Sequence, residues 1–277
     1  MVASRLIEWA EAHGRDLPWR HTRDPWAILV SEVMLQRTQV ARVIPVWRAF
    51  LERFPTAQAC AAADQAEVVI AWHGMGYNRR ALNLHRCAIA IAQDHAGDVP
   101  DDLAALLALP GIGPYTARAV LAFAFEQRVG VLDVNAARVH ARLRGRAVDQ
   151  READDATPPG RAWAWNQAIL DLGATVCTKR APACASCPVA EGCAWRGAGP
   201  DPAGIGQRQS RFEGSDRQGR GRLVNALRIG PVSTNPSTLA LTMGWPDDPE
   251  RSLRVANSVV ADGLAKWEDD SGTICLR

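Results

Sequence analysis

Four cysteines gather within seventeen residues of this 277-residue chain. They are Cys177, Cys184, Cys187 and Cys193, and six, two and five residues separate them in turn. No histidine lies between them, so a metal held here has only sulfur ligands nearby. Four thiolates suit a tetrahedral zinc ion or an iron–sulfur cluster. Structural zinc sites usually show two close cysteine pairs, and this run has one. The spacing predicts a metal centre and leaves both kinds open.

A second candidate is the glycine-rich stretch LPGIGPYTARAV, residues 109–120. Gly111 and Gly113 permit a hairpin that is too tight for a side chain. Its backbone N–H groups and the start of the following helix can point at a phosphate. A plain turn between helices needs one glycine rather than two around a single residue. The pattern therefore favours a helix-hairpin-helix element that binds DNA.

Two carboxylates stand in suggestive surroundings. Glu32 shares a helical face with Ile28, Leu29 and Leu35, so it lies either at the edge of an apolar face or buried within it. Burial would raise its pKa and make it an acid near neutrality. Asp133 is a candidate helix N-cap. Together the two could cleave a bond to an anomeric carbon, with one acid for the leaving group and one anion for the oxocarbenium ion.

Helices must position these residues, because the first 200 residues carry the 3.6-residue apolar period and lack sustained alternation. The segment DPWAILVSEVML opens with Asp24 as predicted N-cap and Pro25 at the first helical position. Further helices are predicted in AEVVIAWHG, RRALNLHRCAIAIAQDHAG, DVNAARVHARL and RAWAWNQAILDLGATVC, and on both sides of PGIGP. The composition then becomes glycine-rich, which predicts a linker over 197–216. Three helices and a hairpin in LAKWEDDSGTICLR predict a small winged-helix-like module over 217–277.

The composition indicates a cytoplasmic protein. The net charge of +2 is only mildly basic, and no apolar run approaches the roughly 20 residues that span a bilayer. The first residues lack the apolar block of a signal peptide. Only two of the 32 basic residues are lysines, Lys179 and Lys266. The clustered cysteines favour a metal over disulfides in such a chain.

Seven motifs in order carry a family resemblance: LPWR, SEVMLQRTQV, GMGYNRRALNLH, LPGIGPYTARAV, LDVN, NQAILDLGATVC and the cysteine run. Over residues 5–196 the chain resembles the MutY-type adenine DNA glycosylases of the helix-hairpin-helix superfamily. The resemblance implies an all-α fold of two helical subdomains. One is a six-helix barrel with the hairpin over 24–132, and the other joins 1–23 to 133–196. The tail resembles the short C-terminus of actinobacterial members, which lack the nudix-like domain.

The resemblance also implies roles for single residues. Glu32 would protonate a flipped adenine, Asp133 would stabilise the sugar cation, and Tyr115 and Asn135 would orient this chemistry. The four cysteines would bind one four-iron four-sulfur cluster, and Gly111 and Gly113 would contact the DNA backbone. The remaining substrate contacts would come from Trp19, Arg20, Leu35, Val40, Gln167, Arg37 and Tyr77.

The implied function is hydrolysis of the N-glycosidic bond of adenine mispaired with 8-oxoguanine or guanine in double-stranded DNA, by a monomer. The related bifunctional enzyme has its Schiff-base lysine where Tyr115 stands, so a monofunctional enzyme is expected. Arg37 stands where the family usually has glutamine, and a similar thymine/uracil mismatch branch carries arginine there. That branch is the first alternative, although it does not keep the acid at Glu32. A non-catalytic DNA-binding module is the second.

Overall fold

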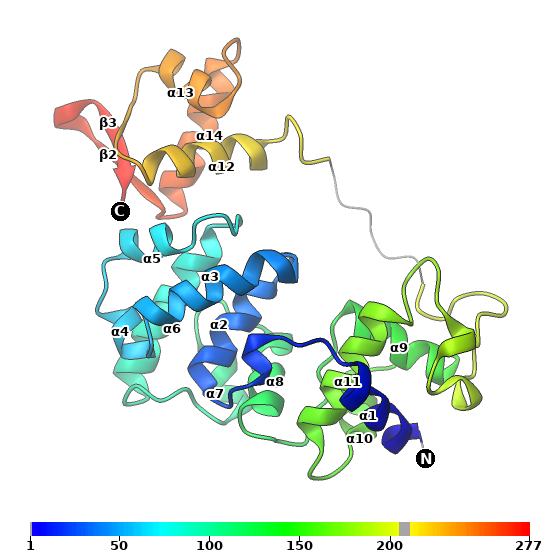
Figure 1. Cartoon of the computed structure of the whole chain (residues 1–277). Coiled ribbons are helices and arrows are strands. Elements are labelled where there is room, and N and C mark those ends of the chain that lie inside the picture. The colour runs from blue at the N-terminus through cyan, green and yellow to red at the C-terminus, as the bar shows by residue number, and fades with distance from the viewer. Residues whose placement is uncertain (1, 205–210) are drawn as a thin grey trace. The chain divides into compact units, whose positions relative to one another are not determined.

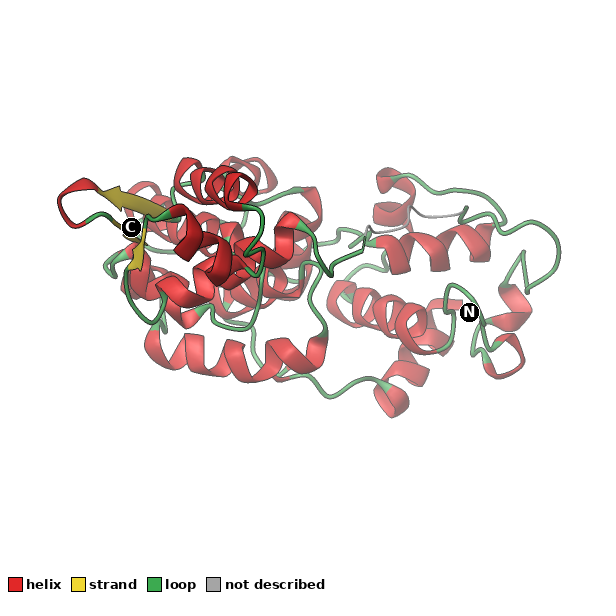
Figure 2. Cartoon of the chain, turned by 90° about the horizontal axis from the view of Figure 1, so that it is seen from above, coloured by secondary structure: helices red, strands yellow, loops and turns green. Residues whose placement is uncertain are grey.

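The computed structural model describes residues 2–204 and 211–277, which form two compact units (Figure 1). Unit 1 comprises Met1–Glu32, Asp101–Ala108 and Ile112–Gln207, and unit 2 comprises Val33–Pro100, Leu109–Gly111 and Arg208–Arg277. Helices dominate the described residues, and the strands are short and lie near the C-terminus of the chain (Figure 2). The predicted mainly helical fold is confirmed.

Unit 1 has a core formed by its first helix and two later ones. Leu6 and Ile7 pack with Val139, Ile169 and Leu172, all at most 2% exposed, so the start of the chain is joined to segments 130 residues away. Its elements are α1 (Val2–His13), η1 (Pro18–Arg20), α2 (Pro25–Leu35, whose last turn belongs to unit 2), α7 (Leu103–Ala108), α8 (Pro114–Phe123), α9 (Val134–Arg144), α10 (Gln150–Ala156), α11 (Ala162–Thr175), η2 (Cys184–Ser186) and η3 (Ala190–Gly192).

Helix α2 starts where the sequence predicts. The Asp24 carboxylate accepts a hydrogen bond from the backbone N–H of Trp26 at 3.0 Å, and Pro25 occupies the first helical position. Helix α9 ends at Gly145, whose φ of +73° is the left-handed conformation typical of a residue after a helix. Both ends are therefore set by local sequence.

Unit 2 packs helices around aromatic side chains. Phe50 on α3 meets Trp72 edge-on at 6.2 Å between ring centroids, and both are fully buried. The Trp72 indole N–H donates to the Gly76 carbonyl at 3.2 Å, which anchors the loop that follows. The helices of this part are α3 (Val40–Arg53), α4 (Ala57–Ala61), α5 (Gln65–Ala71) and α6 (Arg79–Asp94).

The C-terminal part of unit 2 contains three helices and a three-stranded antiparallel sheet in the order β1-β3-β2, with Trp267 opposite Ile274. The predicted helices and hairpin are confirmed, and β1 is an additional strand. The Arg228 guanidinium joins this part to α5 and to the start of α6, because it donates to Val69 O at 3.0 Å and to Asn78 Oδ1 at 2.8 Å. The elements are α12 (Asp216–Leu227), β1 (Val232–Ser233), α13 (Pro236–Met243), α14 (Pro249–Ala261), β2 (Ala265–Glu268), η4 (Asp269–Ser271) and β3 (Thr273–Leu276).

The compact units do not coincide with the predicted segments. The first part of α2 and all of α8 belong to unit 1, although both lie within the predicted barrel over 24–132. The predicted linker 197–216 begins with an anchored residue, because Asp201 pairs with the buried Arg142, and its residues 205–210 lie outside the described residues. The four-segment division therefore stays a prediction.

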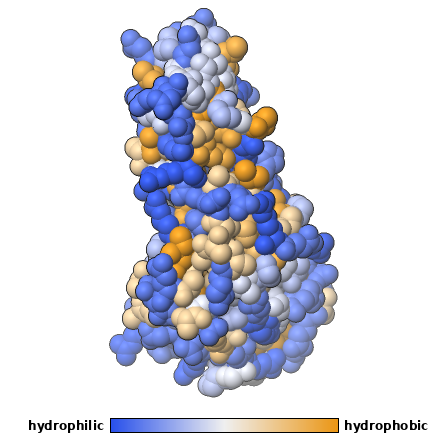
Figure 3. Space-filling view, turned by 90° about the vertical axis from the view of Figure 1, so that its left-hand side faces the viewer, coloured by the Kyte–Doolittle hydropathy of each residue, from blue (hydrophilic) through white to orange (hydrophobic). Residues whose placement is uncertain are grey.

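The surface seen in Figure 3 is mixed, and hydrophilic residues surround and interrupt the hydrophobic ones. No helix within residues 2–204 and 211–277 combines the length and the apolar character needed to cross a membrane.

Candidate active site and cysteine loop

Glu32 on α2 is buried, with 4% of its surface exposed. The Tyr115 hydroxyl donates a hydrogen bond to its carboxylate, and Oε2 has no partner among the described residues. Burial raises the pKa of Glu32 to about 7. The hydrogen bond from Tyr115 opposes this rise, the charge of Asp133 adds to it, and the charge of Arg20 opposes it. The buried alternative for Glu32 is therefore the one found, and its carboxyl can hold a proton near neutral pH.

Tyr115 reaches Glu32 because α8 begins at Pro114, directly after the hairpin. This places Tyr115 in the first turn of α8. Burial and then the charge of Glu32 raise the pKa of Tyr115 well above its usual value. Tyr115 therefore stays a neutral phenol and serves as a hydrogen-bond donor.

The two hairpin glycines differ in what they require. Gly111 has a φ of +79°, and a Cβ on it would lie 2.6 Å from the Cβ of Asn83, so only glycine fits. Gly113 has a φ of −97° and caps the start of α8, and a Cβ there would meet no atom of residues 2–204 and 211–277 within 4 Å. The prediction that both positions are too tight for a side chain is therefore correct for Gly111 and wrong for Gly113. The space in front of Gly113 is open.

Asp133 is a helix cap in the structure. Its Oδ1 accepts hydrogen bonds from the backbone N–H groups of Asn135 at 2.9 Å and Ala136 at 2.6 Å, at the start of α9. Its Oδ2 accepts from the Asn135 side-chain amide at 3.0 Å. Its negative charge also acts on Glu32. The capping role and the place beside a second carboxylate, which the sequence left as alternatives, are both present.

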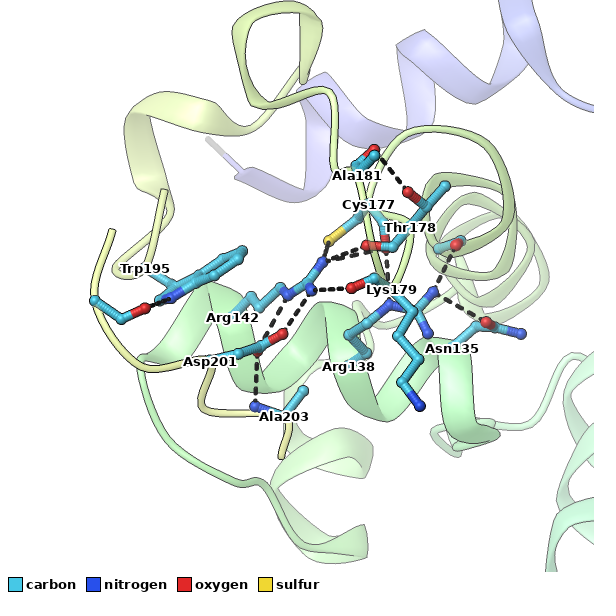
Figure 4. A network of polar contacts seen from close by, with 12 residues as sticks. Asn135, Arg138, Arg142, Cys177, Thr178, Lys179, Ala181, Trp195, Asp201 and Ala203 are labelled. Atoms are coloured by element: carbon cyan, nitrogen blue, oxygen red, sulfur yellow. Dashed lines mark hydrogen bonds and ion pairs between the residues drawn. The ribbon is translucent and has the colours of Figure 1, made fainter. Parts of the chain in front are cut away.

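A chain of hydrogen bonds runs from this carboxylate to the cysteine loop. Asn135 accepts a hydrogen bond from Arg138 at 2.9 Å, and the Arg138 Nε donates to the Cys177 carbonyl at 2.8 Å. The Arg138 Nη2 also donates a hydrogen bond to the Gly173 carbonyl at 2.7 Å. Figure 4 shows Arg138 between Asn135 and the start of the loop. Sequence reasoning did not single out Arg138.

The four cysteines line one small cavity of about 30 Å³, together with Arg142 and Trp195. Cys187 lies within electrostatic range of each of the other three. The part of the chain that the structure describes contains no group of three or more histidine, cysteine or acidic side chains arranged to hold a single metal ion. The predicted convergence of the four thiols is present, because all four line this one cavity.

Arg142 on α9 supports this loop from below (Figure 4). Its guanidinium donates to the Cys177 sulfur at 3.4 Å and to the Thr178 carbonyl at 2.8 Å. It also pairs with Asp201 at 2.6 Å and lies 4.4 Å from the Trp195 ring centroid. Only 2% of the Arg142 side chain is exposed. A single buried cation therefore ties the first cysteine to the segment beyond the last one.

Arg20, a predicted substrate contact, is fixed by an acid that sequence reasoning missed. Asp171 on α11 is buried and accepts both terminal nitrogens of Arg20, at 2.7 and 2.9 Å. It also accepts the Arg15 Nε at 2.6 Å. Burial acts to raise the pKa of Asp171, but the hydrogen bonds and charges of Arg20 and Arg15 lower it overall. An acid inside the apolar helix AILDLG was the available signal.

Replacing Asp171 with asparagine is expected to reduce the free energy of unfolding by about 3 kcal/mol, because a buried guanidinium loses its counter-charge. Urea unfolding at pH 7 measures this. Asp16→Asn is the matched control, since Asp16 pairs with His21 on the surface, where 88% of its side chain is exposed. Equal effects of the two substitutions would show that the Asp171 cluster is not a structural anchor.

The other predicted substrate contacts are divided between the units. Trp19 and Gln167 are buried in unit 1, with 6% and 8% of their surface exposed. The rest belong to unit 2, where Leu35 and Val40 are half-buried and Arg37 and Tyr77 are exposed. Arg37 and Tyr77 both have positive φ, at 56° and 46°.

Comparison with known proteins identifies the architecture. Residues 30–156 match the HhH-GPD superfamily of base excision DNA repair proteins. The adenine DNA glycosylase of Mycolicibacterium smegmatis is 45% identical, over 96% of this chain and 92% of that protein. A solved thermostable thymine-DNA glycosylase matches 70% of this chain and 94% of its own at a TM-score of 0.67 and 29% identity. Endonuclease III trapped in a covalent complex with DNA matches 70% of this chain and 93% of its own, at a TM-score of 0.60 and 23% identity. It therefore shares the fold.

The match to the mycobacterial relative covers 96% of this chain, so the segments that hold the hairpin, Glu32 and the cysteine loop lie within the matched region. The superfamily match covers residues 30–156, from within α2 to the end of α10, and therefore contains Glu32, Tyr115, Asp133 and Asn135. This chain belongs to the adenine DNA glycosylases of the HhH-GPD superfamily and is an enzyme of base excision DNA repair.

Proposed function

We propose that the enzyme removes adenine mispaired with 8-oxoguanine or guanine in duplex DNA, and that it acts as a monofunctional glycosylase that uses water. The observation that carries this proposal is the buried carboxyl of Glu32, whose pKa is raised to about 7 by burial, beside Tyr115 and Asp133. Two carboxyl groups in unequal surroundings suit an acid and an anion in one reaction.

In the proposed reaction, protonated Glu32 donates its proton to a ring nitrogen of the flipped adenine. The bond between the sugar C1′ and the base then breaks, and its electron pair leaves with the base. The Asp133 carboxylate, held by the start of α9, stabilises the positive charge left on the sugar. Water adds to C1′ and releases a proton, which gives free adenine and an abasic site.

The single-function assignment rests on Tyr115, which occupies the hairpin position where a bifunctional relative would have an amine. The chain has two lysines in all. Lys179 lies in the cysteine loop and Lys266 pairs with Glu268 on β2, so neither belongs to the hairpin. Duplex product should therefore stay uncut until alkali is added, and borohydride should trap no enzyme–DNA adduct.

Around the base, we propose that Trp19, Arg20, Leu35, Val40 and Gln167 form the walls of the adenine pocket. Arg37 and Tyr77 would lie beside the opposite base, and Gly111 and Gly113 would offer backbone N–H groups to a phosphate. Arg37 only donates hydrogen bonds, and guanine and 8-oxoguanine both present a carbonyl to such a donor. A weak preference between the two opposite bases follows.

A panel of duplexes tests the proposed function. Single-turnover assays would follow release of adenine, thymine or uracil placed opposite guanine or 8-oxoguanine. The proposal expects free adenine with either opposite base. Faster release of thymine or uracil than of adenine would reject the substrate assignment.

We also propose that the four loop cysteines hold one four-iron four-sulfur cluster. An all-sulfur donor set of four cysteines that line one small cavity supports such a cluster. Because such a group joins segments separated in sequence, it would fold the loop over 177–193 and keep it on α9. The chemistry that it would supply is structural or electron-transferring, and no step of base excision requires it.

Anaerobically purified protein is expected to be brown and to contain about four irons per chain. Cys187→Ser should lower the iron content and the visible absorbance at least by half. Cys275→Ser is the matched control, because Cys275 lies on β3, far along the chain from the loop, and iron should stay unchanged. Stoichiometric zinc without iron in the wild type would contradict the cluster.

A further inference from the structure

Unit 2 contains a groove of about 980 Å³ that lies between its first helices and its C-terminal part. One wall comes from the segment that leads into α3, a second from the loop before α6, and the third from α12 and the residues before it. Arg37 lies on the first wall, Tyr77 on the second and Arg217 on the third. None of the segments after residue 210 has been given a role by the proposed active site.

The groove is strongly cationic. Six arginines and a single carboxylate line it, namely Arg37, Arg42, Arg79, Arg80, Arg217, Arg220 and Asp262. Asp262 pairs with Arg220 at 2.5 Å and with Arg79 at 3.6 Å. Arg80 is structural, because its terminal nitrogens donate to the carbonyls of Val33, Met34, Gln36, Met75 and Gly76.

Two of the remaining arginines have their charge unneutralised. Within residues 2–204 and 211–277, neither Arg37 nor Arg42 makes an ion pair, and both are exposed. Arg217 on α12 lies against the Tyr77 hydroxyl, to which it donates at 3.4 Å. Six arginines and one carboxylate in a single groove suit a ligand with several phosphates in a row.

Two aromatic rings border the same groove. Tyr77 is 40% exposed and Phe212 is 58% exposed. The Arg217 guanidinium lies 5.9 Å from the Phe212 ring centroid. Exposed rings among arginines are what proteins use to bind nucleic-acid strands, since bases stack on the rings and phosphates meet the cations.

The backbone of the groove is strained on two of its walls. Arg37 and Tyr77 have φ of +56° and +46°, in the left-handed region that costs a side-chain-bearing residue about 1–2 kcal/mol. Both strained residues direct a cation or a ring at the same groove. Strain of this kind persists where the surrounding structure holds a residue for use.

We propose that this groove binds the sugar–phosphate backbone of the DNA strand opposite the adenine, and that the C-terminal module supplies Arg217 and Phe212 to it. The strand assignment rests on the proposed function, in which Tyr77 lies beside the opposite base. The module thereby adds a phosphate contact on the strand that does not lose a base.

The first test measures binding of the full-length protein to a fully matched 25-base-pair duplex over a range of salt concentrations. Each lost phosphate contact lowers the slope of log K against log salt by about 0.9 and weakens binding about fivefold at 0.15 M salt. Arg217→Gln and Arg42→Gln should each show that loss. Arg254→Gln on α14 and Arg48→Gln on α3 are controls outside the groove, and neither should change the slope.

The second test assigns the strand. Methylphosphonates, which carry no charge, replace three phosphates of either the adenine strand or its complement around an adenine–guanine mismatch. Neutralising the complement should abolish the effect of Arg217→Gln on binding, whereas neutralising the adenine strand should leave that effect intact.

Unchanged slopes for both Arg217→Gln and Arg42→Gln would overturn the proposal, and so would coupling to the adenine strand alone. In both variants, adenine release at saturating enzyme should stay within about twofold of wild type, because neither Arg217 nor Arg42 is among the residues proposed to act on the adenine or its sugar. If the wild type releases no adenine at all, the proposed function fails, while the matched-duplex slopes still decide whether the groove binds phosphates.

Discussion

Glu32→Gln is expected to slow single-turnover adenine excision by at least about 10²-fold, and by up to about 10⁴-fold, the range for loss of a general acid. Glutamine keeps the shape of the side chain and can still accept the hydrogen bond from Tyr115, so binding of duplex DNA should survive. An excision rate near that of the wild type would remove Glu32 from the mechanism.

The pH dependence of excision provides an independent check. Since burial raises the pKa of Glu32 to about 7, the wild-type rate should fall about tenfold per pH unit above that value, where the carboxyl has lost its proton. The hydrogen bond from Tyr115 lowers the pKa of Glu32, so Tyr115→Phe should move the falling part of the pH–rate profile, its alkaline limb, to higher pH. A limb that stays in place would show that Tyr115 does not act on Glu32.

The same buried carboxyl should weaken the fold at high pH. Its folded pKa of about 7 exceeds the ordinary 4.5, so its contribution to stability is complete below pH 4.5 and is lost as the pH rises through 7. At pH 8 the ionised form costs about 3 kcal/mol, from 1.36 kcal/mol per pKa unit. Glu32→Gln should therefore be less active and more stable than wild type at pH 8, which thermal unfolding can measure.

Asp133→Asn is expected to reduce excision about 10²–10³-fold, because the sugar cation loses its fixed negative charge. Asparagine caps helices as well as aspartate does, so α9 should keep its start and the protein should keep its stability. A large loss of rate with an unchanged free energy of unfolding would show that the negative charge of Asp133, and not its capping of α9, matters for excision.

The matched control is Asp149→Asn. Asp149 caps α10, where its Oδ1 accepts from the Glu152 N–H at 2.8 Å, and it has no place in the proposed site. Both substitutions remove one negative charge from a helix start in unit 1. If they reduce excision equally, the effect of Asp133 reflects its cap or the overall charge, not the sugar cation.

Features that depend on nearby residues could be predicted from the amino-acid sequence. The cysteine run, the hairpin glycine Gly111 and the start of α2 at Asp24 are local patterns, since each arises from residues within a few positions of one another. Helix periodicity likewise predicted α6, α9 and α11, because the apolar face of a helix is visible as apolar residues three and four positions apart in that segment. The ordered motifs carried the family resemblance.

Features that depend on segments far apart in the sequence required the folded structure. Glu32 could have lain at an edge or in the interior, and its burial became known once α8 brought Tyr115 to it. Asp133 is both a cap and a neighbour of that acid, which no local pattern can express. Gly113 was expected to be crowded, but the space before it is open because no other residue that the structure describes packs there.

The partners of buried charges were equally hidden. Asp171 pairs with Arg20 across about 150 residues, and Arg142 pairs with Asp201 across about 60. Neither pair therefore produces a recognisable spacing pattern in the sequence. The cationic groove joins Arg37 and Tyr77 to Arg217, which sits on a module that looked like an appendage beyond a linker. Charge and burial act through space rather than along the chain, and the fold alone sets those distances.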